Sequence, residues 1–199
     1  YMADYGVDDL RNTPLATDNY EDSYDDDGNY IPVRNGEIES LRDFATKYLK
    51  VVKECKSRDE GSDNCFAPEY RYWDNSLLDE RDYFNGRSNT YVLADGSVIS
   101  LDYYGPISIL VDVNGKKGPN RAGYDLWDMS IFYDGVIDES GVGPECRGRI
   151  DAEYNDDDLK CEQTSAHEKR EWRFEDFCKD GAYGGCFGHL LNNNFKFDY

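Results

Sequence analysis

The sequence contains no hydrophobic run long enough to cross a membrane, because no stretch approaches the roughly 20 apolar residues that a transmembrane helix needs. Its first residues, Tyr1-Met2-Ala3-Asp4, do not have the pattern of a signal peptide. Basic residues are scarce: 22 Lys and Arg stand against 42 Asp and Glu, and the formal net charge is −20. This charge repels phosphate backbones and anionic lipids, which argues against nucleic acid and membrane surfaces as partners and favours cations.

The sequence also lacks the motifs of the common catalytic sites. It contains no G-x-S-x-G, H-E-x-x-H, G-x-x-x-x-G-K-[ST] or G-x-G-x-x-G pattern. Of the two histidines, His167 lies in a charged segment, which is typical of a surface residue. His189 follows Cys186 by three residues, and a Cys–His nucleophile would require that Cys186 be reduced. We therefore expect a protein that is not an enzyme.

Cysteine, in contrast, is well represented, and the six cysteines fall into three local pairs along the chain. No pair has the two-residue spacing of a zinc site. An even number of cysteines among acidic loops is typical of disulfides in an oxidising compartment, and the alternative is six buried free thiols in a cytosolic protein. We expect three bridges that each close a short loop rich in Gly or Asp, namely Cys55–Cys65, Cys146–Cys161 and Cys178–Cys186.

The length of 199 residues suits one domain with an arm. Residues 1–36 form an acidic, tyrosine-rich arm, for which we expect irregular structure that packs on another segment or stays mobile. The run Asp25-Asp26-Asp27-Gly28-Asn29 resembles part of an EF-hand loop, but Arg34 stands where the bidentate Glu belongs. A solvated acidic turn is the better interpretation. The globular domain is then residues 37–199.

Hydrophobic periodicity predicts an α+β fold. Apolar residues recur at three- and four-residue steps over residues 37–56, which predicts a long amphipathic helix with one buried stripe. Residues 90–104 read as a hairpin that turns at Ala94-Asp95-Gly96-Ser97, and residues 106–115 as a third, central strand. Residues 126–139 read as a second hairpin that turns at Asp134-Gly135. We expect one helix packed on one face of an antiparallel β-meander.

The segment between the predicted third strand and the second hairpin is rich in oxygen donors. Asp112, Asn114, Asn120 and Asp125 are spread over a glycine-containing loop, and such loops can supply the six to eight oxygen ligands of Ca²⁺. Lys116 and Lys117 would then have to point outward. The alternative is a network of Asx turns that closes the loop without a metal. A phosphate cradle is disfavoured because the two aspartates would repel it.

These segments together resemble a known family. The block from Tyr91 to Ile137 is similar to the globular half of type IV pilin-like proteins, which include pilins, minor pilins and type II secretion pseudopilins. The end of the chain, residues 178–199, is similar to the closing pattern of that family: a cysteine pair around a small loop, a short apolar stretch, an Asn-containing turn and a final aromatic-rich strand. The resemblance covers roughly residues 37–199. It implies no catalytic group, only the Cys178–Cys186 bridge and the loop from Asp112 to Asp125.

The resemblance implies a structural role outside the cell. The family has an N-terminal apolar helix that inserts in the membrane and forms the filament core, and this sequence does not contain it. Either the helix was removed or a separate short helical pilin chain supplies it, as in split pilins. We expect an extracellular subunit of a pilus or pseudopilus whose partners are other pilin-like subunits. The alternative is a tip adhesin, because many of the 17 Tyr and three Trp stand beside Asp or Asn and could stack on glycans or contact a host protein.

Overall fold

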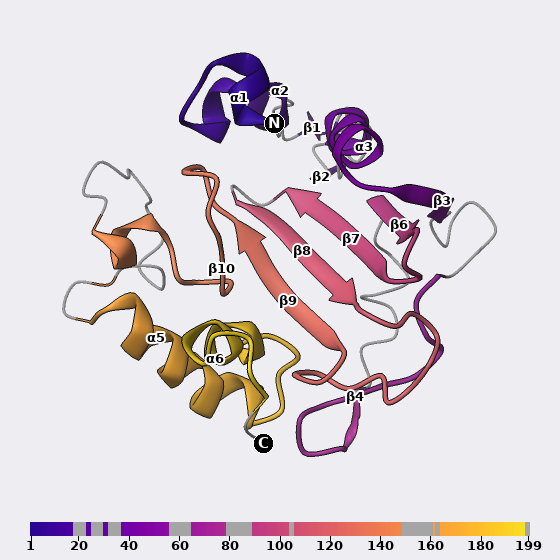
Figure 1. The fold of residues 1–199 in the computed structure, drawn as a ribbon, viewed down its shortest axis with the longest axis vertical. Helices are drawn as coiled ribbons and strands as arrows, with labels where there is room; N and C mark the ends of the chain where they lie inside the picture. Colours follow the sequence, from indigo (N-terminus) through magenta and orange to yellow (C-terminus); the bar gives the residue numbers. More distant parts are fainter. Residues whose placement is uncertain are drawn as a thin grey trace.

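The computed structural model describes residues 1–17, 23–24, 30–31, 37–55, 65–78, 89–103, 106–148, 161 and 164–197. A six-stranded antiparallel sheet forms its centre, with the strands in the order β10-β9-β8-β7-β6-β3 (Figure 1). The strands are β3 (Val51–Cys55), β6 (Asn89–Leu93), β7 (Val98–Tyr103), β8 (Ile107–Asp112), β9 (Leu126–Ile131) and β10 (Ile137–Asp138). Strands β6 to β10 are neighbours in sequence and in space, which confirms the predicted meander.

Both predicted hairpin turns are present, and the same local chemistry forms each. In the β6–β7 turn the Asp95 carboxylate accepts a hydrogen bond from the Ser97 N–H at 3.0 Å, and Gly96 has φ +92°. In the β9–β10 turn the Asp134 carboxylate accepts the Val136 N–H at 3.2 Å, and Gly135 has φ +75°. A carboxylate that accepts an N–H two residues onward, followed by a glycine with positive φ, stabilises a tight reversal.

Helix α3 (Glu37–Tyr48) covers one face of the sheet, as the hydrophobic pattern predicts. Its residues Leu41 and Ala45 are buried against side chains of β6, β7 and β8. The first 17 residues add three short elements to the same layer: α1 (Met2–Tyr5), η1 (Leu10–Asn12) and α2 (Pro14–Thr17). Leu10 and Leu15 join this core, and the Leu10 N–H donates to the Tyr133 carbonyl at 2.7 Å. The described beginning of the predicted arm therefore packs on the domain.

The predicted helix over residues 37–56 is wrong in its last part. The helix ends at Tyr48, and Val51–Cys55 form the edge strand β3 in antiparallel pairing with β6. The Lys50 carbonyl accepts the Ala94 N–H at 2.9 Å, so the β6–β7 turn fixes the point where the chain changes direction. Val52, which the pattern placed in the buried stripe, is 64% exposed. Pairing with the edge of β6 therefore determines the structure of this segment, although its apolar residues have helical spacing.

The opposite face of the sheet carries a second part of the core. Val98, Leu110 and Leu126 alternate along their strands with the residues that face α3, so they point to the second face. The segment 65–78 covers them, and it contains the small hairpin of β4 (Tyr70–Arg71) and β5 (Leu77–Leu78). A further two-stranded pair joins β1 (Ser23–Tyr24) to β2 (Tyr30–Ile31); the rest of the predicted arm from residue 18 to 36 lies outside the described residues.

The C-terminal part is helical where the resemblance implied a final strand. It contains η3 (Pro144–Arg147), α5 (Ala166–Arg173), η5 (Phe174–Cys178) and α6 (Cys186–Asn192), and α6 packs against β9 and β10 (Figure 1). Ser165 and Glu168 form a reciprocal capping box at the start of α5. The apolar residues of this part make a third buried cluster around Phe174, Phe187 and Leu190. The implied final strand is therefore wrong for the described residues up to Phe197.

All three predicted disulfides are present. The structure joins Cys55 to Cys65, Cys146 to Cys161 and Cys178 to Cys186, and no described cysteine is free. Three bridges indicate an oxidising, extracellular environment. No helix among the described residues is long and apolar enough to cross a membrane.

Candidate functional site

The loop between β8 and β9 brings the four predicted oxygen donors together. Asp112 is the last residue of β8 and pairs with Leu126, the first residue of β9, so the antiparallel register places Asp112 beside Asp125. The Val113 N–H donates to the Asp125 carbonyl at 2.9 Å and closes the base of the loop. Lys116 and Lys117 are exposed, as the calcium hypothesis requires.

Asp125 is the centre of the hydrogen bonding in this loop. It is 3% exposed. Its carboxylate accepts the backbone N–H of Asn120 at 2.7 Å, the backbone N–H of Arg121 at 2.5 Å and the side-chain amide of Asn114 at 3.1 Å. Asn120 has φ +51°, a conformation that asparagine tolerates better than most residues. One carboxylate thus organises residues on both sides of the loop.

Asp112 is fully buried and connects the loop to the segment below it. Its carboxylate accepts the Tyr70 hydroxyl and, at 3.1 Å, the Asn114 N–H. The Tyr70 hydroxyl in turn accepts the Ala67 N–H at 3.0 Å. Burial raises the pKa of Asp112 to about 6, the charge of Asp125 adds to the rise, and the hydrogen bonds from Tyr70 and Asn114 oppose it. Burial likewise raises the pKa of Tyr70.

The contacts of the loop match the Asx-turn alternative, because the oxygens of both aspartates accept N–H or O–H groups of the protein. Two amide oxygens, Asn114 Oδ1 and Asn120 Oδ1, are nevertheless buried without a hydrogen-bond partner among the described residues. A hard cation would use oxygens of this kind. Within the described part of the chain no three His, Cys, Asp or Glu side chains come together as a metal site. The donor set fits Ca²⁺ in chemical type, and the calcium site stays a prediction.

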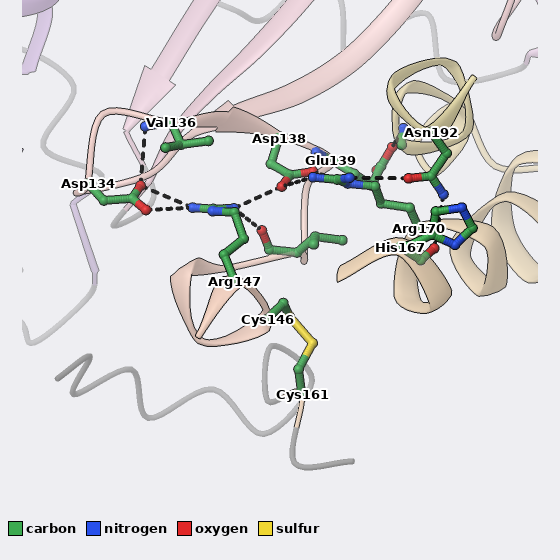
Figure 2. A network of polar contacts seen from close by, with 12 residues as sticks. Asp134, Val136, Asp138, Glu139, Cys146, Arg147, Cys161, His167, Arg170 and Asn192 are labelled. Atoms are coloured by element: carbon green, nitrogen blue, oxygen red, sulfur yellow. Dashed lines mark hydrogen bonds and ion pairs between the residues drawn. A yellow bond between two sulfur atoms is a disulfide. The ribbon is translucent and has the colours of Figure 1, made fainter. Parts of the chain in front are cut away.

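A second polar centre, which the sequence did not reveal, lies under the β9–β10 hairpin (Figure 2). Asp138 is fully buried and accepts Arg147 Nη1 at 2.9 Å, Arg170 Nη2 at 2.6 Å and Arg170 Nε at 2.8 Å. Arg147 also reaches both oxygens of Asp134, at 3.0 and 2.9 Å, and Arg170 reaches Asn192 Oδ1 at 3.2 Å. The network therefore joins the hairpin to η3, α5 and α6.

Glu139 extends this centre to the start of α6. Its carboxylate, fully buried, accepts the Gly185 N–H at 3.0 Å and the Gly188 N–H at 2.9 Å. These N–H groups belong to the N-cap residue and the first turn of α6, where backbone donors have no partner within the helix. Burial raises the pKa of Glu139 to about 7; Arg173, whose Nε lies 3.5 Å from Oε1, opposes the rise, and Asp128 adds to it. The Glu139 side chain, directly after β10, therefore caps the start of α6.

The two histidines occupy different environments. His167 is exposed, as predicted. His189 stacks on Phe174 with ring centroids 3.9 Å apart, and its Nδ1 lies 2.8 Å from Glu171 Oε2. Cys186 is bonded to Cys178, so the Cys–His nucleophile considered from the sequence does not form.

Local signals existed for part of what the sequence analysis missed. The spacing of Ser165 and Glu168 is that of a capping box, which marks the start of α5. Asp138 and Arg170, in contrast, are 32 residues apart, and a chain with 42 acidic residues gives no reason to select Asp138 among them.

Comparison of the chain with protein-family models, curated proteins and solved structures finds no match.

Proposed function

We propose that this chain is the globular ectodomain of a structural subunit that assembles into an extracellular filament of the type IV pilus or pseudopilus kind. The observation that carries the proposal is the placement of α3. This helix directly precedes the edge strand β3, lies along one face of the six-stranded sheet and buries Leu41 and Ala45 there. A helix in this position can connect a filament core to an outward-facing sheet, which is the arrangement that the sequence resemblance implies.

Further features suit a subunit that works outside the cell. Three disulfides cross-link the body, and each closes a segment of 15 residues or fewer. The Cys178–Cys186 bridge joins η5 to α6. The contacts of Asp138 and Glu139 with Arg170 and the start of α6 tie these helices to the sheet. Such bonds resist local opening under shear, because several must break together. The filament core itself would come from an apolar helix of this or another chain.

The test is to locate the chain on cells of its source organism. Antibodies raised against the 199-residue chain are used for immunogold electron microscopy of cells and of filaments released by shearing. Gold along the length of filaments would support a main structural subunit. Gold only at filament ends would instead support the tip adhesin, which a glycan array would then examine. Absence of the chain from every filament, with the protein present elsewhere at the surface, would refute the proposal.

A further inference from the structure

A hollow of about 690 Å³ lies between the first residues of the chain and helix α3. Four aromatic rings line it, those of Tyr1, Tyr5, Phe44 and Tyr48, and the carboxylates of Glu39 and Asp43 stand at the same hollow. The rings form a continuous wall: the Tyr1 ring lies 5.3 Å from Phe44 and 5.4 Å from Tyr48, nearly perpendicular to both. Aromatic faces beside carboxylates combine the two groups that attract organic cations.

The two carboxylates form no ion pair within the described structure, although Arg42 interacts with Asp43 at longer range and Lys47 lines the same hollow. Glu39 and Asp43 are exposed and lie four residues apart on α3, so like charges face one another on successive turns, which is unfavourable. Among the described residues, neither side chain takes part in a hydrogen bond or an ion pair. A positively charged group between them would remove this repulsion.

The expected internal partner of Asp43 points elsewhere. Lys47 follows Asp43 by four residues, the spacing at which opposite charges pair on a helix. Its ammonium group instead lies 3.2 Å from Asp4 Oδ2 and 5.0 Å over the Tyr48 ring. The structure thus shows how an ammonium group is held at this wall, between a carboxylate and an aromatic face, and it leaves the Glu39–Asp43 side of the hollow negative.

From this geometry we infer a binding site for an organic ammonium ion, either a lysine side chain of a peptide or a free amine. The ammonium group binds between Glu39 and Asp43, and its hydrocarbon part packs against Tyr1, Tyr5 and Phe44. The net charge of −20 attracts cations to the whole molecule, and the hollow selects those with an apolar body. The inference does not depend on the filament proposal, since it concerns only residues of α1 and α3 and the first residue of the chain.

The experiment is an NMR titration of the whole ¹⁵N-labelled chain at constant ionic strength. The probes are an end-blocked Gly-Lys-Gly peptide, butylamine as a free amine, and an end-blocked Gly-norleucine-Gly peptide as the neutral control. We expect saturable shifts of the α3 amide signals with the lysine peptide or butylamine, and none with norleucine. Binding of the peptide alone assigns the site to a protein segment, whereas equal binding of butylamine assigns it to free amines. Failure of both cations, or equal shifts with norleucine, would overturn the inference.

Charge-matched variants separate a site from general attraction. Glu39→Gln with Asp43→Asn removes two charges at the hollow, and Asp176→Asn with Asp180→Asn removes two exposed charges in the C-terminal part. The first pair should weaken binding by about tenfold, the second by less than about twofold. Unchanged signals of the strands β7 and β8 show that each variant is folded. Equal weakening by both pairs would mean that only the overall charge attracts the probes.

Discussion

At the scale of single residues, Glu139 shows how a buried carboxylate makes stability depend on pH. Its pKa in the folded protein is raised by burial to about 7 from an ordinary value of 4.5. Between these two pH values the folded state binds more protons than the unfolded state, so the free energy of unfolding falls as pH rises through this window. The contribution is constant below about 4.5 and above about 7.

Replacement of Glu139 by Gln should remove this part of the pH dependence. We expect the unfolding free energy of the native chain to fall, relative to that of Glu139→Gln, by about 2–3 kcal/mol between pH 4.5 and pH 7.5. Urea unfolding at both pH values measures it. Asp112 titrates in both proteins, so its effect cancels in the difference. Parallel pH profiles of the two proteins would contradict the prediction.

The hydroxyl of Tyr70 makes two hydrogen bonds with buried groups. Its hydroxyl donates to Asp112 and accepts the Ala67 N–H. Tyr70→Phe leaves both buried groups without this partner, which should lower the unfolding free energy by about 1–3 kcal/mol at neutral pH. It should also raise the pKa of Asp112, because the Tyr70 hydrogen bond holds that pKa down. Carbon-detected NMR of the Asp112 carboxyl follows the pKa; an unchanged value would show that the bond is absent in solution.

At the scale of elements, the Cys178–Cys186 bridge connects η5 to the first residue of α6. Replacement of both cysteines by alanine should lower the unfolding free energy by about 2–5 kcal/mol, the usual range for a small secreted domain. Amide hydrogen exchange should accelerate most in α6 and least in β7 and β8, since those central strands keep all their pairing. Peptide mapping without reduction checks the native pairing, and a bond such as Cys55–Cys178 would refute it.

The elements also show which parts of the fold follow from local sequence. Both hairpin turns were predictable, because Asp95 and Gly96, like Asp134 and Gly135, determine the reversal within four residues. The end of α3 was not, because Val51–Cys55 keep a helical apolar pattern and become a strand only by pairing with β6. The spacing of apolar residues within this segment contains no information about the edge of β6 with which it pairs.

The polar contacts of the site region likewise include local ones, which the sequence could predict, and long-range ones, which it could not. The grouping of Asp112 with Asp125 follows from one antiparallel loop, so a prediction from the 14 consecutive residues 112–125 was enough to find it. The contacts of Asp138 with Arg170 and of Glu139 with the start of α6 join residues that are 32 to 49 positions apart, and they exist only after α5 and α6 have packed on the hairpin. Long-range polar contacts of this kind have no signature in local spacing.

At the scale of the whole molecule, the isolated chain should be monomeric. The element that would drive filament assembly is an apolar helix, and no described helix has that character. The net charge of −20 also opposes self-association at low ionic strength. Light scattering at low and high salt measures the mass. Stable filaments of the isolated chain would mean that the edge strand β3 or the first residues polymerise by another route.

Calcium dependence belongs to the same scale, because a ligand that binds only the folded form stabilises the entire molecule. For a Kd of about 0.1–1 mM, typical of extracellular calcium modules, about 1–2 mM Ca²⁺ adds about 0.4–2 kcal/mol to the unfolding free energy. We therefore expect a small rise in the melting temperature with Ca²⁺ and a smaller one with Mg²⁺. Sodium chloride of matched ionic strength controls for screening of the negative charge.

Two substitutions distinguish a metal site from a closed turn. Asp125→Asn keeps the size of the side chain and removes a charged ligand, so a calcium-induced shift should disappear. Asn114→Asp places a third carboxylate beside Asp112 and Asp125, whose oxygens lie within reach of the Asn114 side chain or backbone. Without metal this variant should melt lower because like charges repel, and Ca²⁺ should stabilise it more than the native chain. If Ca²⁺ shifts all three proteins equally, the loop is held by its own hydrogen bonds and binds no calcium.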